Sequence, residues 1–289
     1  MELQRDRIRA IAIDLDGTVL GADSKLSGRT LRALRGCVSG GLRVIIATGR
    51  CMASSEEYRA AIGADGPMVY YNGAVTLDMP SRKTLDKHTI GRAVVSCCAD
   101  IAHTENTHFQ TFLCGEYGGF SETLVAEKPS GETQAYTKRT GLGFTYGSLY
   151  DVLKDGDGFY CPKGIFIADE PKLRRAQRLV HERLGDAVDT MMSADTILEV
   201  LASGVSKAAG LRTALDRYRL SPDEVIAFGD EENDIKMLSM AGFSVAPSNA
   251  RPSVRDTADL VIGANTDDSI ARFLEETLGF CGERDRKSR

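Results

Sequence analysis

Two apolar runs, at residues 8–15 and 42–47, decide the fold class of this chain. They read IRAIAIDL and LRVIIA, so neither run alternates between apolar and polar side chains. Strands of this kind are buried on both faces, which is typical of a parallel sheet covered by helices. Helical spacing follows the first run at 27–38 and the second up to about residue 62, and a third short strand is expected at 67–74. This order is that of βαβ units, so the sequence predicts an α/β fold built on a parallel sheet.

The same alternation of strands and helices returns in the last third of the chain. Strands are expected there at 225–230, 243–246 and 258–263. Helices are expected at 207–218, 233–240 and 267–278. Both ends of the chain therefore contribute to one Rossmann-like domain, residues 1–79 and 196–289.

The middle of the chain has a different character, richer in Thr, Gly and charged residues. Helices are expected at 91–104 and 170–185, and strands at 108–114 and 164–168, whereas 115–160 is expected to be rich in loops. Residues 80–195 are therefore predicted to form a smaller α+β domain inserted into the first one.

Composition narrows the function. Apolar residues make up 42% of the 289, enough for a real core, and the net charge of −5 comes without a long basic stripe, which argues against nucleic acid as a partner. The seven cysteines include no C-x-x-C pair, which argues against a disulfide framework and a thiolate zinc site. The chain shows no signal-peptide pattern at its start and no apolar run of about 18 residues. We expect a cytoplasmic enzyme without a membrane partner; the oligomeric state stays open.

The first run ends in a pair of acids, Asp14 and Asp16, followed by Gly17-Thr18. Neighbouring carboxylates repel, and a divalent cation is the natural way to keep both ionised. One carboxylate can then act as a nucleophile and the other as a general acid and base. The competing explanation is an Asx-turn that ends a strand, since Asp-Gly is a common turn pair.

Two further polar clusters also follow expected strands. Thr48-Gly49-Arg50 combines a hydroxyl with backbone N–H groups at a helix start, which is an anion site or an ordinary helix N-cap. Lys207 opens a helix in the same way, and is either a solvated charge or a cation that neutralises a phosphoryl group.

The fourth cluster, Gly229-Asp-Glu-Glu-Asn-Asp234, places four acids and an amide in one loop. Oxygen-rich clusters suit a hard cation such as Mg²⁺. Acids at a helix N-terminus are also favoured by the helix dipole, so this loop alone does not settle the matter. Because open α/β sheets bind ligands at the carboxyl ends of their strands, the four clusters together indicate one site.

This ordered set, D-x-D-G-T, T-G-R, a lone Lys and G-D-x-x-N-D, resembles the haloacid dehalogenase superfamily of phosphohydrolases. The resemblance covers about half the chain, through both flanking segments. Two segments depart from the family pattern: 244–250 (SVAPSNA) resembles its G-V-A-M-G-N-A stretch, and 265–269 has Ser269 where Gly is usual.

The position of the insert indicates the branch of the family. One helix and two loops use up the chain between Thr18 and Thr48, whereas the chain from Thr48 to Lys207 is far longer than a crossover needs. With Tyr71-Asn72-Gly73-Ala74 just before the insert, the chain resembles the Cof-like branch, whose α/β cap lies between the second and third motifs.

The resemblance also implies roles for the residues. Asp14 would be the nucleophile that forms an aspartyl-phosphate, and Asp16 would protonate the leaving oxygen and then activate water. Thr48 and Lys207 would hold the phosphoryl oxygens. Mg²⁺ would be bound by Asp14, Asp230 and the backbone carbonyl of Asp16. Asn233 and Asp234 would support the metal and the phosphate. Gly49, Arg50 and Asn72 would lie beside the phosphate. Arg50 and Asn72 either contact the substrate or hold a loop.

We therefore expect a Mg²⁺-dependent phosphatase that acts on a sugar phosphate or a similarly small phosphorylated metabolite. A phosphomutase on the same fold is the first alternative; it would need a second phosphate site, and Lys128, Lys138, Arg139 and Lys163 of the insert form no convincing cluster. A non-catalytic metabolite-binding protein is the second alternative, although every motif residue is intact.

Overall fold

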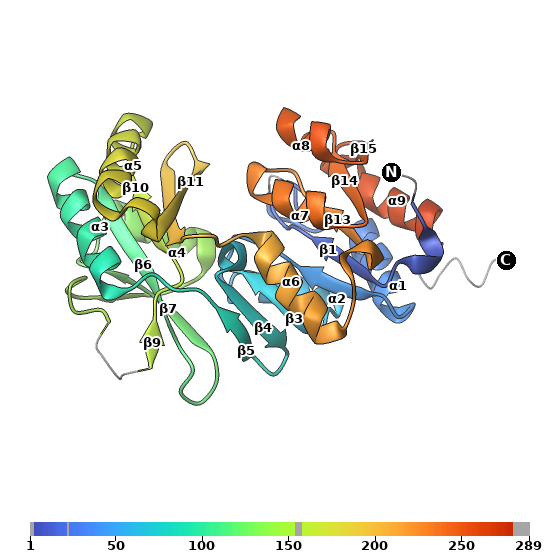
Figure 1. Cartoon of the computed structure of the whole chain (residues 1–289), viewed down its shortest axis with the longest axis horizontal. Helices are drawn as coiled ribbons and strands as arrows, with labels where there is room; N and C mark the ends of the chain where they lie inside the picture. Colours follow the sequence, from blue (N-terminus) through green and yellow to red (C-terminus); the bar gives the residue numbers. More distant parts are fainter. Residues whose placement is uncertain (1–2, 22, 154–157, 280–289) are drawn as a thin grey trace. The chain divides into compact units, whose positions relative to one another are not determined.

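The computed structural model describes residues 3–21, 23–153 and 158–279 of the chain. The chain divides into two compact units (Figure 1): Met1–Ser81 with Ser206–Arg289, here called the core unit, and Arg82–Val205, here called the insert. The boundary predicted at 195/196 is therefore ten residues too early. The reason is β12 (Ile197–Ala202), which pairs with two strands of the insert, β10 (Gly164–Ile167) and β11 (Val188–Ala194).

The core unit contains a five-stranded parallel sheet in the order β15-β14-β13-β1-β2. Its strands are β1 (Ala10–Ile13), β2 (Arg43–Ile46), β13 (Val225–Phe228), β14 (Phe243–Pro247) and β15 (Leu260–Ile262). All four residues of β1 and of β13 are buried, as the apolar runs predict. The predicted fold class is confirmed. Because β13 and β2 flank β1, the chain leaves all three strands at the same edge of the sheet.

Helices cover both faces of this sheet (Figure 1). Helices α6 (Lys207–Tyr218), α7 (Ile235–Met240) and α8 (Pro252–Thr257) pack in a row, and so do α2 (Glu56–Ile62), α1 (Gly28–Ser39) and α9 (Ser269–Leu278). Two helices of the core unit, α1 and α6, are capped by serines, since Ser27 accepts from the Thr30 N–H and Ser206 accepts from the Ala209 N–H. These caps fix where α1 and α6 begin.

A short antiparallel pair extends the core unit. β3 (Gly66–Tyr70) meets the chain just after β2 through an Ala47–Val69 bridge, and it pairs with β4 (Val75–Met79). A short 3₁₀ helix, η2 (Tyr71–Gly73), connects β3 and β4. This arrangement carries Asn72 to the edge of the sheet at which β2 ends.

The insert is built on one mixed sheet in the order β11-β12-β10-β6-β7-β8, with β9 paired to β6. Helices α3 (Arg92–Glu105) and α5 (Glu170–Leu184) pack on each other and on β10 around an apolar core. The other elements of the insert are β5 (Lys83–Lys87), β6 (His108–Gly115), β7 (Ser121–Ala126), α4 (Gly131–Thr140), β8 (Phe144–Tyr146), β9 (Phe159–Tyr160), β10 (Gly164–Ile167) and β11 (Val188–Ala194).

The expectation of a loop-rich stretch at 115–160 is wrong for most of its described residues. It contains β7, α4, β8 and β9, while 154–157 lie outside the described part. Helix α4 buries only Thr133 and Tyr136, so its sequence carries no apolar periodicity. Its stability comes in part from a capping box between Ser130 and Thr133, which short-range apolar patterns do not reveal.

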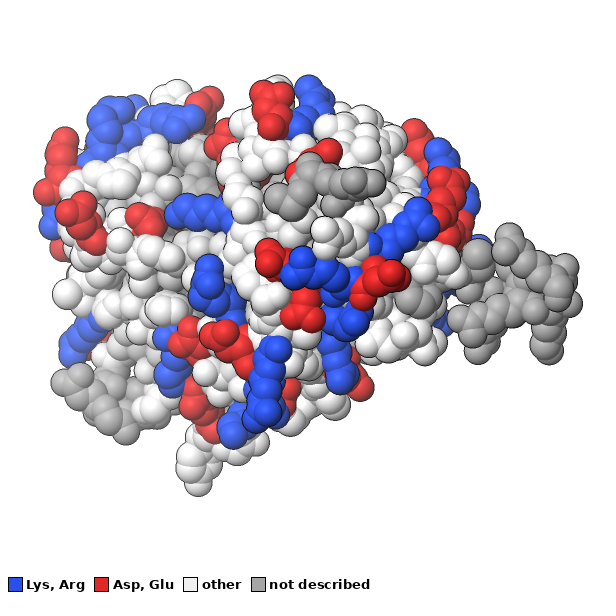
Figure 2. Space-filling view, turned by 45° about the vertical axis from the view of Figure 1, so that its right-hand side comes forward, with Lys and Arg blue, Asp and Glu red and all other residues white. Residues whose placement is uncertain are grey.

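Charge and membrane character can be read from the described residues. On the face shown in Figure 2, Lys and Arg side chains are interspersed with Asp and Glu and form no continuous basic band among the described residues. Within 3–21, 23–153 and 158–279, no helix combines the length and the apolar character needed to cross a bilayer.

Candidate active site

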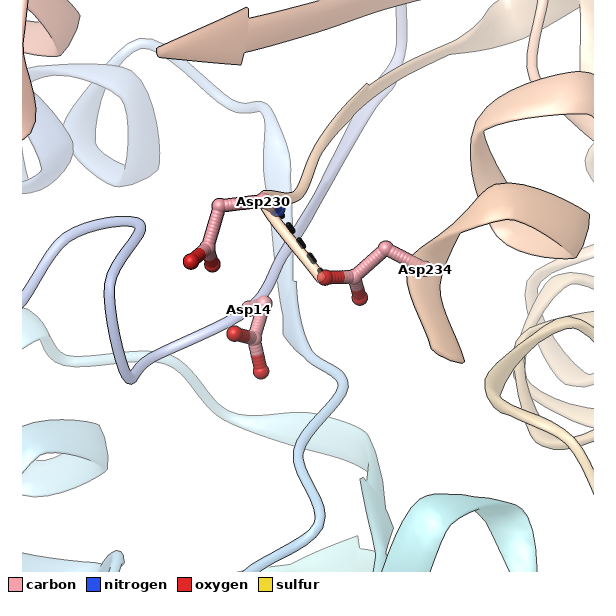
Figure 3. Close-up of side chains that lie close together, drawn as sticks. All are labelled: Asp14, Asp230 and Asp234. Atoms are coloured by element: carbon pink, nitrogen blue, oxygen red, sulfur yellow. Dashed lines mark hydrogen bonds between the residues drawn. The ribbon is translucent and has the colours of Figure 1, made fainter. Parts of the chain in front are cut away.

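Three aspartates from two distant segments meet where β1 and β13 end. The Asp14 N–H donates to the Phe228 carbonyl at 3.1 Å, so Asp14 lies directly beside the last residue of β13. One carboxylate oxygen from each of Asp14, Asp230 and Asp234 lies within 4.8 Å of the other two. Figure 3 shows the Asp14 and Asp230 carboxylates next to one another, with the Asp234 side chain reaching toward them from the start of the following helix. This group is called the acid cluster below.

Lys207 is the cation of the acid cluster. Its Nζ donates to Asp14 Oδ1 at 2.6 Å and to Asp234 Oδ1 at 2.8 Å, and its side chain is 1% exposed. Burial by itself lowers the pKa of Lys207, but the charges of Asp14 and Asp234 outweigh burial and raise it. Lys207 is therefore a permanent ammonium group that fixes the nucleophile candidate Asp14 in place.

Backbone geometry brings the acids this close. Gly17 has a φ of +75°, and a Cβ at this position would lie 2.1 Å from Asp230 Oδ2, so only glycine fits. Asp230 also accepts from the Thr18 hydroxyl at 2.6 Å. Asp234 Oδ2 accepts from the backbone N–H groups of Asp230 and Glu231, at 3.0 and 3.1 Å, which closes the loop after β13.

The acid cluster has too little positive charge of its own. Three buried carboxylates face one buried ammonium group among the described residues. Burial is the main reason that the pKa of Asp14 lies well above its ordinary value and that the pKa of Asp230 is raised to about 7. Asn233 Oδ1 is also buried and has no hydrogen-bond partner within the described part of the chain. An all-oxygen set with excess negative charge fits a hard divalent cation such as Mg²⁺.

These pKa shifts predict how the stability of the metal-free protein depends on pH. The Asp230 carboxyl has a pKa of about 7 in the folded state, against about 3.9 in an unfolded chain. Between these values the folded state binds the extra proton, so the free energy of unfolding should fall as the pH rises from about 4 to about 7. At about 1.4 kcal/mol per pKa unit, the loss from Asp230 is at most about 4 kcal/mol.

Urea unfolding in excess chelator at about pH 5 and about pH 8 measures this effect. The matched variant is Asp230→Asn, which keeps the shape of the side chain but cannot titrate. We expect the wild type to lose more stability than the variant between the two pH values. Equal losses in both proteins would show that Asp230 is not the group responsible.

A second group of predicted residues lies around the end of β2. Thr48 is buried, and its hydroxyl accepts from the Arg50 N–H at 3.1 Å. The Asn72 N–H donates to the Thr48 carbonyl at 2.9 Å, and Asn72 Oδ1 accepts from Asn233 Nδ2 at 2.9 Å. A Cβ on Gly49 would lie 2.9 Å from Asn72 Oδ1, so Gly49 leaves room for this amide. The predicted residues Thr48, Gly49, Asn72 and Asn233 are thus neighbours.

Asp16 is the predicted residue whose carboxylate the structure does not bring into the acid cluster. Its side chain is 56% exposed and is paired with Arg50, whose Nε and Nη2 contact the two carboxylate oxygens at 2.7 and 2.5 Å. This hydrogen-bonded pair raises the pKa of Arg50 above its ordinary value. The roles expected for Asp16 and Arg50 stay predictions, and the structure shows that the two side chains act on each other.

Three residues of the site had no role in the sequence analysis. Besides Thr18, they are Asn249, whose Nδ2 donates to the Gly17 carbonyl at 2.9 Å, and Asn265, whose Nδ2 donates to the Leu20 carbonyl at 2.9 Å. Both asparagines lie in the two C-terminal segments that resemble family patterns. That resemblance is the sequence signal that could have indicated a role for Asn249 and Asn265. The structure shows that these segments hold the backbone that follows Asp16.

Comparisons with known sequences agree with this geometry. The profile of the haloacid dehalogenase-like hydrolase family matches residues 11–274. A 5-amino-6-(5-phospho-D-ribitylamino)uracil phosphatase of Bacillus subtilis, YitU, is 30% identical over 274 residues, which are 92% of this chain and 96% of the relative. The pyridoxal phosphate phosphatase YbhA of Escherichia coli is 27% identical, over 93% of this chain and 98% of the relative.

Solved structures show the same fold. A haloacid dehalogenase-like hydrolase from Bacteroides thetaiotaomicron superposes with a TM-score of 0.82 at 24% identity, covering 93% of this chain and 99% of the other. The sugar phosphatase BT4131, of haloacid dehalogenase subclass IIB, superposes with a TM-score of 0.75 at 19% identity, over 94% of this chain and 100% of the other. The match of the family profile over nearly all of the described core unit and insert shows that the chain belongs to the haloacid dehalogenase-like hydrolases, in their Cof-type branch.

Proposed function

We propose that this hydrolase removes the phosphoryl group from a small phosphorylated metabolite, a sugar phosphate or a similar phosphoester, through an aspartyl-phosphate on Asp14. The observation that carries the proposal is the buried Asp14 carboxylate, held 2.6 Å from Lys207 Nζ inside the acid cluster. The curated relatives support it, since their names make them phosphatases of phosphoribitylaminouracil, pyridoxal phosphate and, in Yersinia enterocolitica, HMP-PP.

In the first half-reaction, an oxygen of the Asp14 carboxylate attacks phosphorus. A bond forms from Asp14 to phosphorus, the bond from phosphorus to the leaving oxygen breaks, and Asp16 gives that oxygen a proton. In the second half-reaction, Asp16 takes a proton from water and the water oxygen attacks phosphorus. The bond from the Asp14 oxygen to phosphorus breaks, which releases inorganic phosphate and restores the Asp14 carboxylate. Asp14 is then free for another cycle, and no oxidant or further reactant is needed.

Positive charge and hydrogen bonds around the phosphoryl group supply most of the catalysis in such reactions. Lys207 orients Asp14 and is close enough to neutralise a phosphoryl oxygen, and the Thr48 hydroxyl lies at the end of the neighbouring strand. Asp14, the backbone carbonyl of Asp16 and Asp230 would hold Mg²⁺, with Asn233 and Asp234 in support. When bound, the ion would supply the positive charge that the acid cluster lacks.

The purified protein should release inorganic phosphate from at least one member of a panel of phosphorylated metabolites in the presence of Mg²⁺. The panel should include sugar phosphates, pyridoxal phosphate and phosphorylated pyrimidine precursors, with Asp14→Asn protein as the blank. Conversion of a sugar phosphate to its isomer without phosphate release would indicate the phosphomutase instead. Binding without any turnover, including turnover of 4-nitrophenyl phosphate, would indicate the non-catalytic protein.

We also expect the enzyme to act in the cytoplasm. The six cysteines in the described part of the chain are free thiols, and a reducing compartment keeps thiols in that state.

A further inference from the structure

The contact between Arg50 and Asp16 is a two-pronged ion pair. Arg50 Nε donates to Asp16 Oδ2 at 2.7 Å and Arg50 Nη2 donates to Asp16 Oδ1 at 2.5 Å. A bidentate pair of this kind sets the direction and the plane of a carboxylate, which a single contact does not. Arg50 is the one side chain in the described residues that binds the Asp16 carboxylate, so it decides where this exposed group points.

Arg50 is itself held from three sides. Its Nη1 donates to the Ser54 carbonyl at 3.1 Å, and its Nη2 also contacts Ser24 Oγ at 3.4 Å. Its guanidinium carbon lies 5.3 Å from the centre of the Tyr58 ring, and the Tyr58 hydroxyl donates to the Ser24 carbonyl at 2.7 Å. The Arg50 side chain is only 20% exposed. All three of its nitrogens donate to protein oxygens, and a rigid group of this kind is suited to hold another side chain still.

We propose that Arg50 is a positioning residue, which holds the Asp16 carboxylate in place for proton transfer and does not bind the phosphoryl group. The proposal rests on the function proposed above, in which Asp16 protonates the leaving oxygen and then activates water. The two-pronged pair holds the ionised carboxylate, the form that takes a proton from water in the second half-reaction. In the first half-reaction one oxygen of Asp16 carries the proton, and the other oxygen can still accept from Arg50. It departs from the sequence-based expectation that Arg50 borders the phosphate, because a phosphoryl group would have to displace Asp16 to reach the prongs of the guanidinium. Lys207 already provides a buried cation beside Asp14.

If Arg50 positions Asp16, the decrease in rate caused by substituting Arg50 should depend on the leaving group. A proton donor matters most when the leaving oxygen is basic, as in phenyl phosphate, and less when it is weakly basic, as in 4-nitrophenyl phosphate. Arg50→Met should therefore lower the rate of phenol release about tenfold to a hundredfold, the usual effect of a misplaced catalytic group. Release of 4-nitrophenol in the first turnover should fall much less.

A double-mutant cycle tests whether Arg50 acts through Asp16. Phenol release is measured for the wild type, Arg50→Met, Asp16→Asn and the protein with both substitutions. On the Asp16→Asn background, Arg50→Met should cost less than about twofold, because the carboxylate that it positions is gone. Losses that multiply in full would mean that Arg50 acts independently of Asp16 and would overturn the proposal.

Competitive inhibition by inorganic phosphate separates positioning from phosphate binding. If Arg50 positions Asp16, the inhibition constant of phosphate changes less than about threefold in Arg50→Met, whereas loss of a bidentate phosphate contact weakens binding tenfold or more. A tenfold weaker inhibition would overturn the proposal.

A second substitution at Arg50 keeps the test independent of folding. Arg50→Lys retains the charge without the two-pronged geometry, so it should lose most of the rate that Arg50→Met loses, and it replaces that variant in the cycle if Arg50→Met does not fold. Retention of the full rate by Arg50→Lys would contradict positioning by the guanidinium.

The matched control is Arg29→Met, which removes a similar bidentate pair with Glu275 that contacts no site residue. We expect Arg29→Met to react with both aryl phosphates at the wild-type rate. A wild type that releases phosphate from no substrate would refute the proposed function, whereas an active wild type with independent losses at Arg50 and Asp16 would refute only the role of Arg50.

Discussion

Asp14→Asn should abolish turnover, with a kcat at most about one ten-thousandth of the wild-type value. The amide has almost the same shape as the carboxylate, but it is not a nucleophile, so no covalent phosphoenzyme can form. Residual reaction would have to rely on positioning by the remaining groups alone. The measurement is phosphate release from the best substrate of the panel at saturating concentration, followed long enough to detect a few turnovers.

The same variant should remain folded. Because burial raises the pKa of Asp14, the ionised carboxylate is costly in the metal-free folded protein, and its replacement by a neutral amide relieves that cost. In excess chelator, the unfolding temperature of Asp14→Asn should therefore equal or exceed that of the wild type. Asp223→Asn, the same substitution at an exposed position of the core unit, should retain full kcat. A kcat for Asp14→Asn of a tenth of the wild type or more would exclude Asp14 as the nucleophile.

The central strands could be predicted because their sequence signal is local. Strand β1 lies inside the apolar run 8–15, and β2 lies inside 42–47. All four residues of β1 and the last three residues of β2 are buried, and strands buried on both faces are nearly continuous apolar runs. The convergence of Asp14 with Asp230 was predictable for a related reason. Each of these two residues follows a buried strand of the parallel sheet, and parallel strands place such positions at one edge. Lys207 follows β12, which pairs antiparallel within the insert, so its place was indicated by the order of the motifs and not by the parallel sheet.

The elements that escaped prediction are those whose stability is not local. Strand β7 is only half buried and begins with Ser121 and Glu122, and helix α4 shows no apolar stripe. The pairing of strand β12 with β10 and β11 was not deducible from the sequence, so the predicted domain boundary lies ten residues too early. The partners of a strand depend on the arrangement of the whole sheet, and local sequence patterns do not specify that arrangement.

The arrangement of Asp16 could not be predicted from the spacing of the motif. Strand alternation places Asp14 and Asp16 on one side only if the strand continues, but Gly17 turns the chain with a φ of +75°. The carboxylate of Asp16 then meets Arg50, which comes from the segment after β2. A contact of this kind depends on side-chain packing between two loops, and no periodicity encodes it.

Removal of divalent metal should abolish phosphate release, and added Mg²⁺ should restore it. Three buried carboxylates share one ammonium group, so without a cation the carboxyl groups of Asp14 and Asp230 tend to hold protons. A protonated Asp14 is a poor nucleophile, and two added positive charges would favour its ionised form. The same binding should stabilise the fold by about 2.7 kcal/mol when the Mg²⁺ concentration is a hundred times its dissociation constant. Activity and unfolding temperature are both measured after dialysis against chelator and during titration with MgCl₂.

Two substitutions in the loop after β13 show whether this response comes from the acid cluster. Asp230→Asn removes a buried carboxylate of the cluster, so it should require at least about tenfold more Mg²⁺ for half-maximal activity, in line with the loss of a charged oxygen ligand. Glu232→Gln removes the same charge from an exposed position two residues away, and its Mg²⁺ requirement should match the wild type. Equal shifts in both variants would mean that the ion responds to the overall charge of the loop and not to a site at Asp14 and Asp230. Full activity of the wild type in excess chelator would exclude a catalytic metal altogether, and Lys207 would then be left as the single buried cation, within the described residues, beside the reacting phosphoryl group.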